Sequence, residues 1–438
     1  MGDARSFSAS GPLTGTIRVP GDKSISHRAL MLAALAVGES RIEGLLEGED
    51  VIATAGAVRA MGAEVDRAAD GAWHVHGVGV GGLLQPRTAL DMGNSGTSTR
   101  LLMGVIASHP ITATFIGDAS LSARPMARVT EPLGVMGAEF TTAPGGRLPI
   151  MVRGACPAVP INYRLPVASA QVKSALLFAG LNTPGITRIL EPVPTRDHSE
   201  RMLRGFGADI SEETDRHNVR IISIRGERDL KAQAIVVPGD PSSAAFFIVA
   251  ATIVPGSEVR IENVGMNPTR SGLIQVLKAM GAKIELADER TVGGEAVADL
   301  IVRYSRLEGV ETGPDIVPSM VDEFPILFIA AAHANGRSVF RGLAELRVKE
   351  SDRLATMAEG LRALGVTVWD LPDGLEIEGR DRAPFAGDVA IATKLDHRIA
   401  MSFAVAGLIA KNPVTIDDDA PVATSYPQFF DQLAALQA

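Results

Sequence analysis

The 438-residue chain has little cysteine and no long apolar run, and each of these absences excludes a class of protein. A single cysteine, Cys156, excludes an intrachain disulfide and a cysteine-based metal cluster, which agrees with a reducing compartment. No window approaches the about 20 apolar residues of a membrane span, and the N-terminus lacks the apolar core of a secretory signal. We therefore expect a soluble, cytoplasmic protein that does not enter a membrane.

Positive charge is also in deficit, because 42 Lys and Arg stand against 51 Asp and Glu, for a formal net charge of −9. Proteins that bind a phosphate backbone need a basic surface, so nucleic-acid binding is not expected. The eight histidines form no His-Glu-x-x-His pair, and the sequence predicts no metal site. Cys156 lies in a turn-like segment, 154–157, without a neighbouring His, which favours a loop thiol over a nucleophile.

What the chain does contain is a repeat. Polar clusters open small-residue, helix-like apolar runs at intervals of roughly 70 to 80 residues, and a Gly-containing turn and a short strand follow each run. The openings are Asp22-Lys23-Ser24, Asn94-Ser95-Gly96-Thr97, Ser169-Ala170-Gln171, Asp240-Pro241-Ser242-Ser243, Asp322-Glu323 and Asp396-His397-Arg398. The sequence therefore predicts six α/β units that share cores.

A second marker supports the same period, because most units contain a later helix that ends in a shared apolar-Gly signature. Each glycine follows an apolar helical stripe and precedes an alternating strand, which predicts a left-handed C-cap. The signatures begin Met61-Gly62, Met136-Gly137, Phe206-Gly207, Met280-Gly281 and Leu364-Gly365.

The chain is longer than one hydrophobic core usually serves, so six units are expected to divide into two domains of three. The division is predicted near Val236-Val237-Pro238-Gly239, which resembles Val19-Pro20-Gly21 near the start. We expect these two passages to pair as strands that cross between the domains, so that residues 1–20 belong with the second lobe.

Basic residues gather where helices are predicted to begin, although acidic residues are favoured there. A helix N-terminus with Lys or Arg beside it suits a small anion, and several in one chain suggest a polyanionic substrate in a basic cleft.

Read singly, Ser24, Asn94, Ser169, Ser242 and Asp322 are more often helix caps than ligands. No Walker loop is present, because Asp22 separates Gly21 from Lys23 and Gly15 stands one residue too far upstream of Gly21. The clustered cations are Lys23, Arg28, Arg100, Arg124, Arg128, Arg196, Arg347, Lys349, Arg353 and Arg398.

Five motifs, in order along essentially the whole chain, closely resemble the 5-enolpyruvylshikimate-3-phosphate synthase family. The segments Gly44–Val51 and Leu395–Ile399 are more similar to the bacterial class II branch than to the plant and enterobacterial one. Together the motifs are highly specific. They are residues 19–28 (VPGDKSISHR), 93–100 (GNSGTSTR), 124–126 (RPM), 347–354 (RVKESDRL) and 396–401 (DHRIAM).

The resemblance implies a two-domain inverse α/β barrel, the enolpyruvyl transferase fold, built from six βαβαββ repeats with three in each domain. The first lobe would comprise residues 21–237 and the second residues 1–20 plus 238–438, with the active-site cleft between them. The implied reaction transfers the enolpyruvyl group of phosphoenolpyruvate to the 5-hydroxyl of shikimate 3-phosphate and releases phosphate, on the route to chorismate and the aromatic amino acids. It implies no cofactor and no obligatory metal, and we expect a monomer.

The implied chemistry requires cations and two acid/base groups. Both substrates are anions, and addition to C2 of phosphoenolpyruvate needs C3 protonated and the hydroxyl deprotonated. By resemblance, Glu350 donates to C3, Asp322 is oriented on the 5-hydroxyl, and Lys23 touches both substrates. Because Lys349 and Arg353 favour an ionised carboxylate, Glu350 as an acid depends on bound anions that offset them.

The resemblance also assigns the binding residues. Shikimate 3-phosphate would be bound by Lys23, Ser24, Arg28, Ser169, Ala170, Gln171, Arg196, Asp322 and Lys349. Phosphoenolpyruvate would be bound by Lys23, Gly96, Arg124, Gln171, Arg353, His397 and Arg398.

Three positions depart from the family pattern. Thr424 stands where many members have a lysine, so one phosphoenolpyruvate contact is missing or supplied elsewhere, and Ala170 replaces the second serine of some members. Gly96 stands where the class II branch often has Ala, whose methyl would shorten the pocket. Glyphosate occupies that pocket in the family and is longer than phosphoenolpyruvate, so we expect the enzyme to lack this form of tolerance.

Two alternatives stay open from the sequence. UDP-N-acetylglucosamine enolpyruvyl transferase has the same architecture, but it normally carries a reactive cysteine in the loop that here reads Ser120–Arg124, and Cys156 lies outside that loop. A phosphometabolite-binding protein without catalysis would bind anions and release no phosphate. The presence of both Asp322 and Glu350 disfavours this second alternative.

Overall fold

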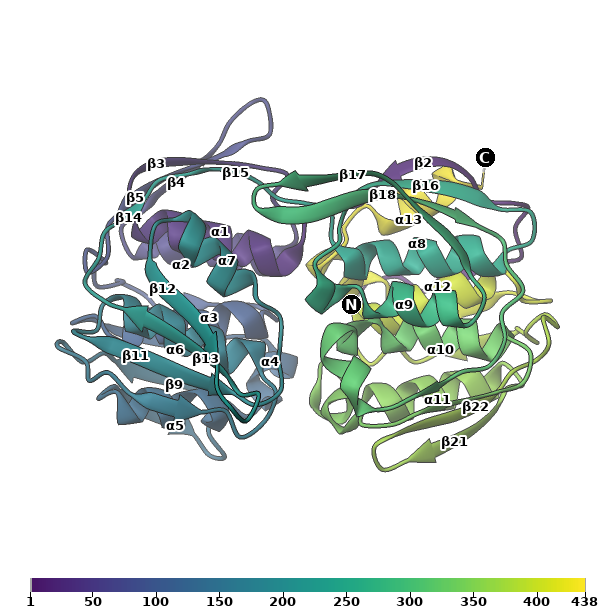
Figure 1. Ribbon diagram of the computed structural model, residues 1–438. Helices are drawn as coiled ribbons and strands as arrows, with labels where there is room; N and C mark the ends of the chain where they lie inside the picture. The colour runs from purple at the N-terminus through teal and green to yellow at the C-terminus, as the bar shows by residue number, and fades with distance from the viewer. Residues whose placement is uncertain (1, 438) are drawn as a thin grey trace. The chain divides into compact units, whose positions relative to one another are not determined.

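The computed structural model describes residues 2–437, which form two compact units. The first unit contains residues 23–237, and the second contains residues up to 22 together with those from 238 onward (Figure 1). Three of the six sheets belong to each unit, and the expectation of six α/β repeats is confirmed. No helix in residues 2–437 is long and apolar enough to cross a membrane.

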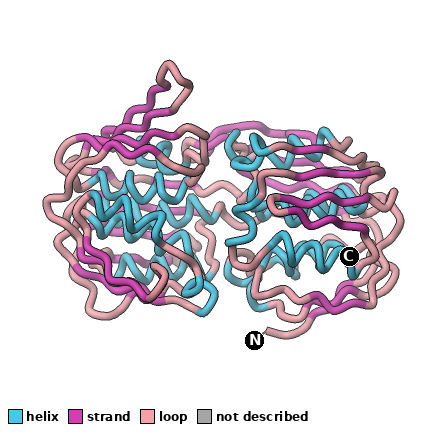
Figure 2. Tube along the Cα trace, turned by 90° about the horizontal axis from the view of Figure 1, so that it is seen from below, coloured by secondary structure: helices cyan, strands magenta, loops and turns pink. Residues whose placement is uncertain are grey.

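In the first unit, three sheets surround a set of buried helices (Figure 2). The strands are β3 (Ala36–Glu43), β4 (Glu64–Arg67), β5 (Trp73–Val78), β6 (Leu90–Asp91), β7 (Thr112–Ile116), β8 (Glu139–Ala143), β9 (Arg147–Arg153), β10 (Asn162–Arg164), β11 (Ile186–Glu191), β12 (Asp209–Thr214), β13 (Arg220–Arg225), β14 (Leu230–Lys231) and β15 (Ala234–Val236). The helices are α1 (Lys23–Leu35), α2 (Glu49–Ala60), α3 (Gly96–Ala107), α4 (Ala119–Ala123), α5 (Ala127–Val135), α6 (Ala170–Leu181) and α7 (His198–Gly205).

The second unit repeats this plan. Its strands are β1 (Arg5–Phe7), β2 (Thr14–Arg18), β16 (Glu258–Gly265), β17 (Lys283–Val292), β18 (Glu295–Arg303), β19 (Glu311–Thr312), β20 (Arg337–Phe340), β21 (Thr367–Leu371), β22 (Gly374–Glu378), β23 (Val389–Ile391) and β24 (Val414–Ile416). Its helices are α8 (Pro241–Ile253), α9 (Gly272–Ala279), α10 (Phe324–His333), α11 (Arg353–Ala363), α12 (His397–Gly407) and α13 (Phe429–Ala435), with 3₁₀ turns η1 (Pro268–Arg270), η2 (Pro314–Ser319), η3 (Val321–Glu323), η4 (Ala344–Val348) and η5 (Ala420–Thr424).

One strand order recurs in the sheets. In β6-β7-β9-β8, β10-β11-β13-β12 and β19-β20-β22-β21, the first pair is parallel and the other two pairs are antiparallel. With the intervening helices this order is the βαβαββ repeat. In β17-β18-β16-β2 the parallel edge strand comes from residues 14–18, so the start of the chain completes a sheet of the second unit.

Apolar helices fill the interior of each unit. All 13 residues of α8 and all 10 of α10 are buried, as expected for helices that are apolar on every side. Strands instead alternate, and β9 reads exposed-buried along its whole length, with one face on the helices and one in solvent. Sheets therefore lie outside the helices in each unit, which is the arrangement of an inverse α/β barrel.

The predicted helix boundaries are confirmed. The polar clusters immediately precede or open α1, α3, α6, α8, α10 and α12. The glycines of all five signatures have positive φ, between 79° for Gly365 and 106° for Gly137, so they end the preceding helices in the left-handed region. Local sequence signals thus mark where these elements begin and end.

The two Val-Pro-Gly passages pair, as predicted. Gly21 and Gly239 form an antiparallel bridge, and the peptide N–H of Asp22 donates to the carbonyl of Pro238 at 2.8 Å. Arg270 of η1 reinforces the pairing, because its buried guanidinium lies 2.9 Å from Asp22 Oδ2 and 3.0 Å from Asp240 Oδ1. Burial opposes the charge of Arg270, but the adjacent carboxylates outweigh it and raise its pKa above the ordinary value.

Candidate active site

Helix α1 of the first unit places Lys23, Ser24 and Arg28 on its first turns. The ammonium of Lys23 forms an ion pair with Asp50 near the start of α2. Arg28 lies one turn further along and is 4% exposed. Its guanidinium donates to Ser199 Oγ through Nε and to Ser174 Oγ through Nη2, both at 2.7 Å. The N-terminus of α1 therefore carries two cations held by groups from α2, α6 and α7.

Gly96 and Arg124 meet at the N-terminus of α3. Arg124 donates to Asn94 Oδ1 at 2.7 Å and to Ser120 Oγ at 3.2 Å, which holds its guanidinium over the first turn of the helix. A Cβ at position 96 would lie 2.8 Å from Arg100 Nη1 and 3.0 Å from Arg124 Nη1. Glycine therefore allows two guanidinium groups to approach this helix end closely.

The N-terminus of α6, also in the first unit, contains Ser169, Ala170 and Gln171. Gln171 accepts from Arg100 Nη1 at 3.0 Å and donates to Thr97 Oγ1 at 3.1 Å, so its amide connects α6 with α3. Ser169 caps α6 by accepting from Val172 N at 3.4 Å, as the capping interpretation expects. That interpretation is wrong for the other four candidates: Ser24 lies inside α1, and the residues at the cap positions of α3, α8 and α10 are Ser95, Asp240 and Glu323 rather than Asn94, Ser242 and Asp322. Arg196 lies half-buried in the segment before α7.

In the second unit, Arg353 connects both predicted acid/base groups. Its guanidinium donates to Glu350 Oε2 at 2.5 Å, to Asp322 Oδ1 at 3.3 Å and to Asp396 Oδ2 at 2.8 Å. The Arg353 side chain is 1% exposed. Burial opposes its charge, but Asp396, Glu350 and Asp322 outweigh that effect and raise the pKa of Arg353 above its ordinary value.

Further cations surround Asp322 in this unit. Lys349 Nζ lies 3.6 Å from Asp322 Oδ1, and Arg398 Nη1 donates to the Asp322 carbonyl at 2.9 Å. Asp396 caps α12 by accepting from Arg398 N at 2.9 Å, so the helix begins with the buried His397 and then Arg398. The second unit therefore brings all six predicted residues into one region: Asp322, Lys349, Glu350, Arg353, His397 and Arg398.

The two regions differ in chemistry. The first unit supplies cations, hydroxyls and an amide at helix N-termini, which suits anionic oxygens. The second unit supplies two carboxylates that face shared cations, which suits proton transfer next to an anion. Among residues 2–437, no group of three or more His, Cys, Asp or Glu is arranged to hold a metal ion.

Several supporting residues were missed by the sequence interpretation. Asp50 pairs with Lys23, Ser174 and Ser199 hold Arg28, and Asp396 orients Arg353. The cluster Asp396-His397-Arg398 was a visible signal for Asp396, whose own role was not assigned. The two serines and Asp50 carry no local signal, because their partners lie far away in the sequence.

Thr424, where the resemblance leads us to expect a lysine, ends η5. Its hydroxyl donates to the carbonyl of Pro421 at 2.7 Å, as expected for a residue that satisfies its own helical turn. The structure describes no cation at that position.

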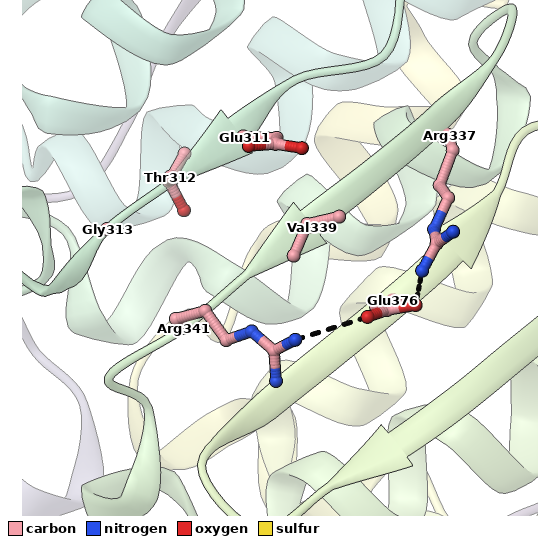
Figure 3. A pocket seen from close by; sticks show the side chains of 7 residues that line it. All are labelled: Glu311, Thr312, Gly313, Arg337, Val339, Arg341 and Glu376. Atoms are coloured by element: carbon pink, nitrogen blue, oxygen red, sulfur yellow. Dashed lines mark hydrogen bonds and ion pairs between the residues drawn. The ribbon is translucent and has the colours of Figure 1, made fainter.

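A surface hollow on the outer face of the β19-β20-β22 sheet is distinct from these regions (Figure 3). It has a volume of about 670 Å³, and Arg337 and Arg341 both pair with Glu376 across it. Glu376 thus engages both arginines, Glu311 also lines the hollow, and none of the lining residues is a predicted site residue. The hollow is lined by Glu311, Thr312, Gly313, Arg337, Val339, Arg341 and Glu376.

Comparison with known proteins identifies close relatives. The sequence model of the family described as EPSP synthase (3-phosphoshikimate 1-carboxyvinyltransferase) matches residues 7–433. A 3-phosphoshikimate 1-carboxyvinyltransferase of Sphingopyxis alaskensis is 68% identical over 99% of this chain and 98% of its own length. The protein of the same name from Zymomonas mobilis is 67% identical over 97% of this chain and 95% of its own length.

Solved structures agree. EPSP synthase from Acinetobacter baumannii superposes with a TM-score of 0.87 at 47% identity, covering 100% of this chain and 98% of that one. The enolpyruvyl transferase NikO from Streptomyces tendae superposes with a TM-score of 0.78 at 19% identity, covering 100% of this chain and 98% of that one. The second likeness concerns the fold alone.

Proposed function

The chain belongs to the EPSP synthase (3-phosphoshikimate 1-carboxyvinyltransferase) family, and on that premise we propose that it transfers the enolpyruvyl group of phosphoenolpyruvate to the 5-hydroxyl of shikimate 3-phosphate. The products are 5-enolpyruvylshikimate 3-phosphate and phosphate. The observation that carries this proposal is the pair of carboxylates, Glu350 and Asp322, on one guanidinium, Arg353, beside further cations. An enzyme that moves protons next to anionic substrates needs such a set.

We propose that the first unit binds mainly by charge. Arg28 and Ser24 bind the carboxylate of shikimate 3-phosphate, Ser169 binds its phosphate, and Arg196 and Ala170 complete the contacts. The serine contacts that hold Arg28 favour this role, since they fix the direction of its guanidinium. Gln171 lies against both substrates, and its bond to Arg100 fixes the side chain.

In this proposal phosphoenolpyruvate is bound by Arg124, the backbone at Gly96, Arg353, His397 and Arg398. The close approach of Arg124 to the α3 N-terminus supports this assignment, because guanidinium and helix dipole both favour an anion there.

The chemical step then has two stages. Addition forms the bond between the 5-oxygen and C2, while Glu350 gives a proton to C3 and the hydroxyl loses its proton with help from Asp322 and Lys23. Elimination breaks the bond from C2 to the phosphate oxygen, C3 returns its proton to Glu350 as the double bond between C2 and C3 forms again, and the proton from the 5-hydroxyl leaves with the phosphate. Lys349 stabilises the ionised Asp322, which lies 3.6 Å from its ammonium.

Phosphate release provides the test. The purified protein should release phosphate with shikimate 3-phosphate and phosphoenolpyruvate together, and not when either is omitted. UDP-N-acetylglucosamine in place of shikimate 3-phosphate should give no release. Release with the nucleotide sugar alone as acceptor, or tight anion binding without any release, would contradict the proposal and support one of the two alternatives.

We further propose that the enzyme acts as a monomer in the cytoplasm. The single cysteine is compatible with a reducing compartment, and the reaction needs only small dissolved substrates. Sedimentation of the purified protein at increasing concentration tests the first point. A mass that stays at the 45.9 kDa of one chain is the expected result.

A further inference from the structure

An ion cluster with a fully buried centre lies in the first unit, outside the residues assigned to the substrates. Lys173 Nζ lies 2.8 Å from Glu191 Oε1 and 2.8 Å from Glu200 Oε1, and all three side chains are 0% exposed. Arg220 completes the cluster, with Nη1 3.1 Å from Glu191 Oε2 and Nη2 3.5 Å from Glu200 Oε1. Arg220 also pairs with Glu212 of β12, so these two cations face three carboxylates, and the cluster joins α6, β11, α7, β12 and β13.

A gain in folding stability does not explain why such a cluster is buried here. Removing charges from water costs more than their attraction usually returns, and apolar side chains of similar volume are often as stable or better. The rest of α6 after Lys173 is apolar or small, as a buried helix of this fold would predict. A lysine at this position therefore points to a function other than filling the core.

The cluster adjoins the two serines that hold Arg28. Lys173 directly precedes Ser174, and Glu200 directly follows Ser199. Both hydroxyls accept from Arg28 at 2.7 Å, and the two hydroxyl oxygens lie 2.7 Å apart. The Lys173–Glu200 ion pair therefore fixes α6 against α7 at the point where the two helices hold the guanidinium.

The same cluster reaches Arg196 by another route. Glu191 ends β11, and its Oε1 accepts from Thr195 N at 3.1 Å and from Thr195 Oγ1 at 2.5 Å. These two hydrogen bonds hold the segment that follows β11 against the Glu191 carboxylate, and Arg196 is the next residue after Thr195. A substitution in the cluster would therefore shift the positions of both arginines assigned to shikimate 3-phosphate, Arg28 and Arg196.

We propose that Lys173, together with Glu191 and Glu200, positions Arg28 and Arg196 for shikimate 3-phosphate. This inference rests on the proposed function, because it presumes that the two arginines bind that substrate. The cluster touches no substrate itself, so its members are positioning residues. Their loss should weaken binding of shikimate 3-phosphate far more than the turnover of bound substrates.

The test compares binding with stability in three variants. Glu200→Gln keeps the shape and removes one charge, Lys173→Met leaves two buried carboxylates short of a partner, and the double variant restores the balance of charge. Asp299→Asn is the matched control, because Asp299 is a buried carboxylate of the second unit that pairs with Arg260 and Arg290. Calorimetric titration of the full chain with shikimate 3-phosphate gives Kd, and thermal unfolding gives Tm.

We expect Glu200→Gln to raise Kd for shikimate 3-phosphate by about 10-fold or more. The amide weakens the ion pair with Lys173, and the serine hydroxyls that hold the Arg28 guanidinium then shift. Lys173→Met should lower Tm most. The double variant should recover much of that Tm while its Kd stays raised by about 10-fold, a separation that a merely structural role does not produce. Asp299→Asn should lower Tm but leave Kd within about two-fold.

Glu200→Gln decides the outcome even if both Lys173 variants fail to fold. Binding of shikimate 3-phosphate by Glu200→Gln at the wild-type Kd would overturn the inference. A wild-type protein that releases no phosphate with both substrates would instead overturn the proposed function. The KM for phosphoenolpyruvate at saturating shikimate 3-phosphate should change much less than the Kd, and an equal rise in both would also contradict the specific positioning role.

Discussion

Nη2 of Arg353 donates to the Glu350 carboxylate at 2.5 Å, while Nη1 of the same guanidinium lies 3.3 Å from Asp322 Oδ1. A guanidinium in direct contact favours the ionised form of a carboxylate, which cannot donate a proton. Bound phosphoenolpyruvate would compete for Arg353 with its own anionic oxygens. In the proposed mechanism, substrate binding thus releases Glu350 from its cation, and the acid becomes available only when there is a C3 to protonate.

Glu350→Gln tests this role directly. The amide keeps the size and the acceptor oxygen that faces Arg353, but it has no carboxylic proton to give. We expect kcat to fall by about 10²-fold or more, while KM for both substrates stays within a few-fold. Steady-state kinetics with each substrate varied would measure this. Glu345→Gln, at an exposed position on η4, is the control, and near-normal turnover of Glu350→Gln would rule out the acid role.

Arg124→Ala should separate binding from chemistry. Arg124 is fixed by Asn94 at 2.7 Å and Ser120 at 3.2 Å, and its guanidinium provides positive charge but does not give up a proton. We expect KM for phosphoenolpyruvate to rise by about 10- to 100-fold with a smaller change in kcat. Arg153→Ala, at an exposed arginine that pairs with Glu139 on the outer sheet face, should leave both constants near wild type. A loss confined to kcat would exclude Arg124 from phosphoenolpyruvate binding.

His333 makes stability depend on pH. It is 4% exposed at the end of α10, neither ring nitrogen makes a hydrogen bond, and burial together with the charge of Arg382 lowers its pKa from 6.5 to about 4. The unfolded chain therefore binds the extra proton between about pH 6.5 and 4, and stability falls as the pH falls through that window.

His333→Leu should remove this component. As the pH falls from about 6.5 to about 4, the free energy of unfolding of the variant should rise by about 3 kcal/mol relative to that of wild type. The reason is that about 2.5 pH units separate the pKa values of His333 in the unfolded and folded states. Urea unfolding at several pH values down to the acid limit of the protein measures the difference. Parallel stability curves for the two proteins would show that His333 does not titrate differently in the folded and unfolded states.

The fold was largely predictable because its repeat leaves local marks. Gly62, Gly137 and their equivalents end helices by a backbone conformation that glycine adopts cheaply, and this preference does not depend on the rest of the fold. The pairing of Gly21 with Gly239 followed from two similar passages. Polar residues that open apolar runs likewise have a local cause in helix capping.

The supporting shell of the site was not predictable in the same way. Arg28 and Ser199 are 171 residues apart, and Lys173 reaches Glu200 only because α6 and α7 belong to the same repeat. Serine and glutamate are common at helix starts, and Lys173 stands out only as a charge in an apolar run, which does not identify its partners. Their partners become apparent only when the topology brings the helices together.

Gly96 is the position at which a single methyl should distinguish two ligands. A Cβ there would lie 2.8 Å from Arg100 Nη1 and 3.0 Å from Arg124 Nη1, both at the ends of flexible side chains that can shift by a few tenths of an ångström. The resemblance places the longer ligand, glyphosate, against this backbone. We therefore expect Gly96→Ala to raise the inhibition constant for glyphosate by about 10-fold or more and the KM for phosphoenolpyruvate by much less.

Parallel inhibition curves for wild type and Gly96→Ala measure this difference. Gly134→Ala is the matched control, because Gly134 lies within α5 and a Cβ there would meet nothing within 4 Å. A small rise in KM is expected even so, because the displaced Arg124 is also a proposed ligand of phosphoenolpyruvate. Equal glyphosate sensitivity in wild type and Gly96→Ala would show that position 96 does not set tolerance. An equal rise in both constants would mean that the methyl acts by moving Arg124 rather than by excluding the longer molecule.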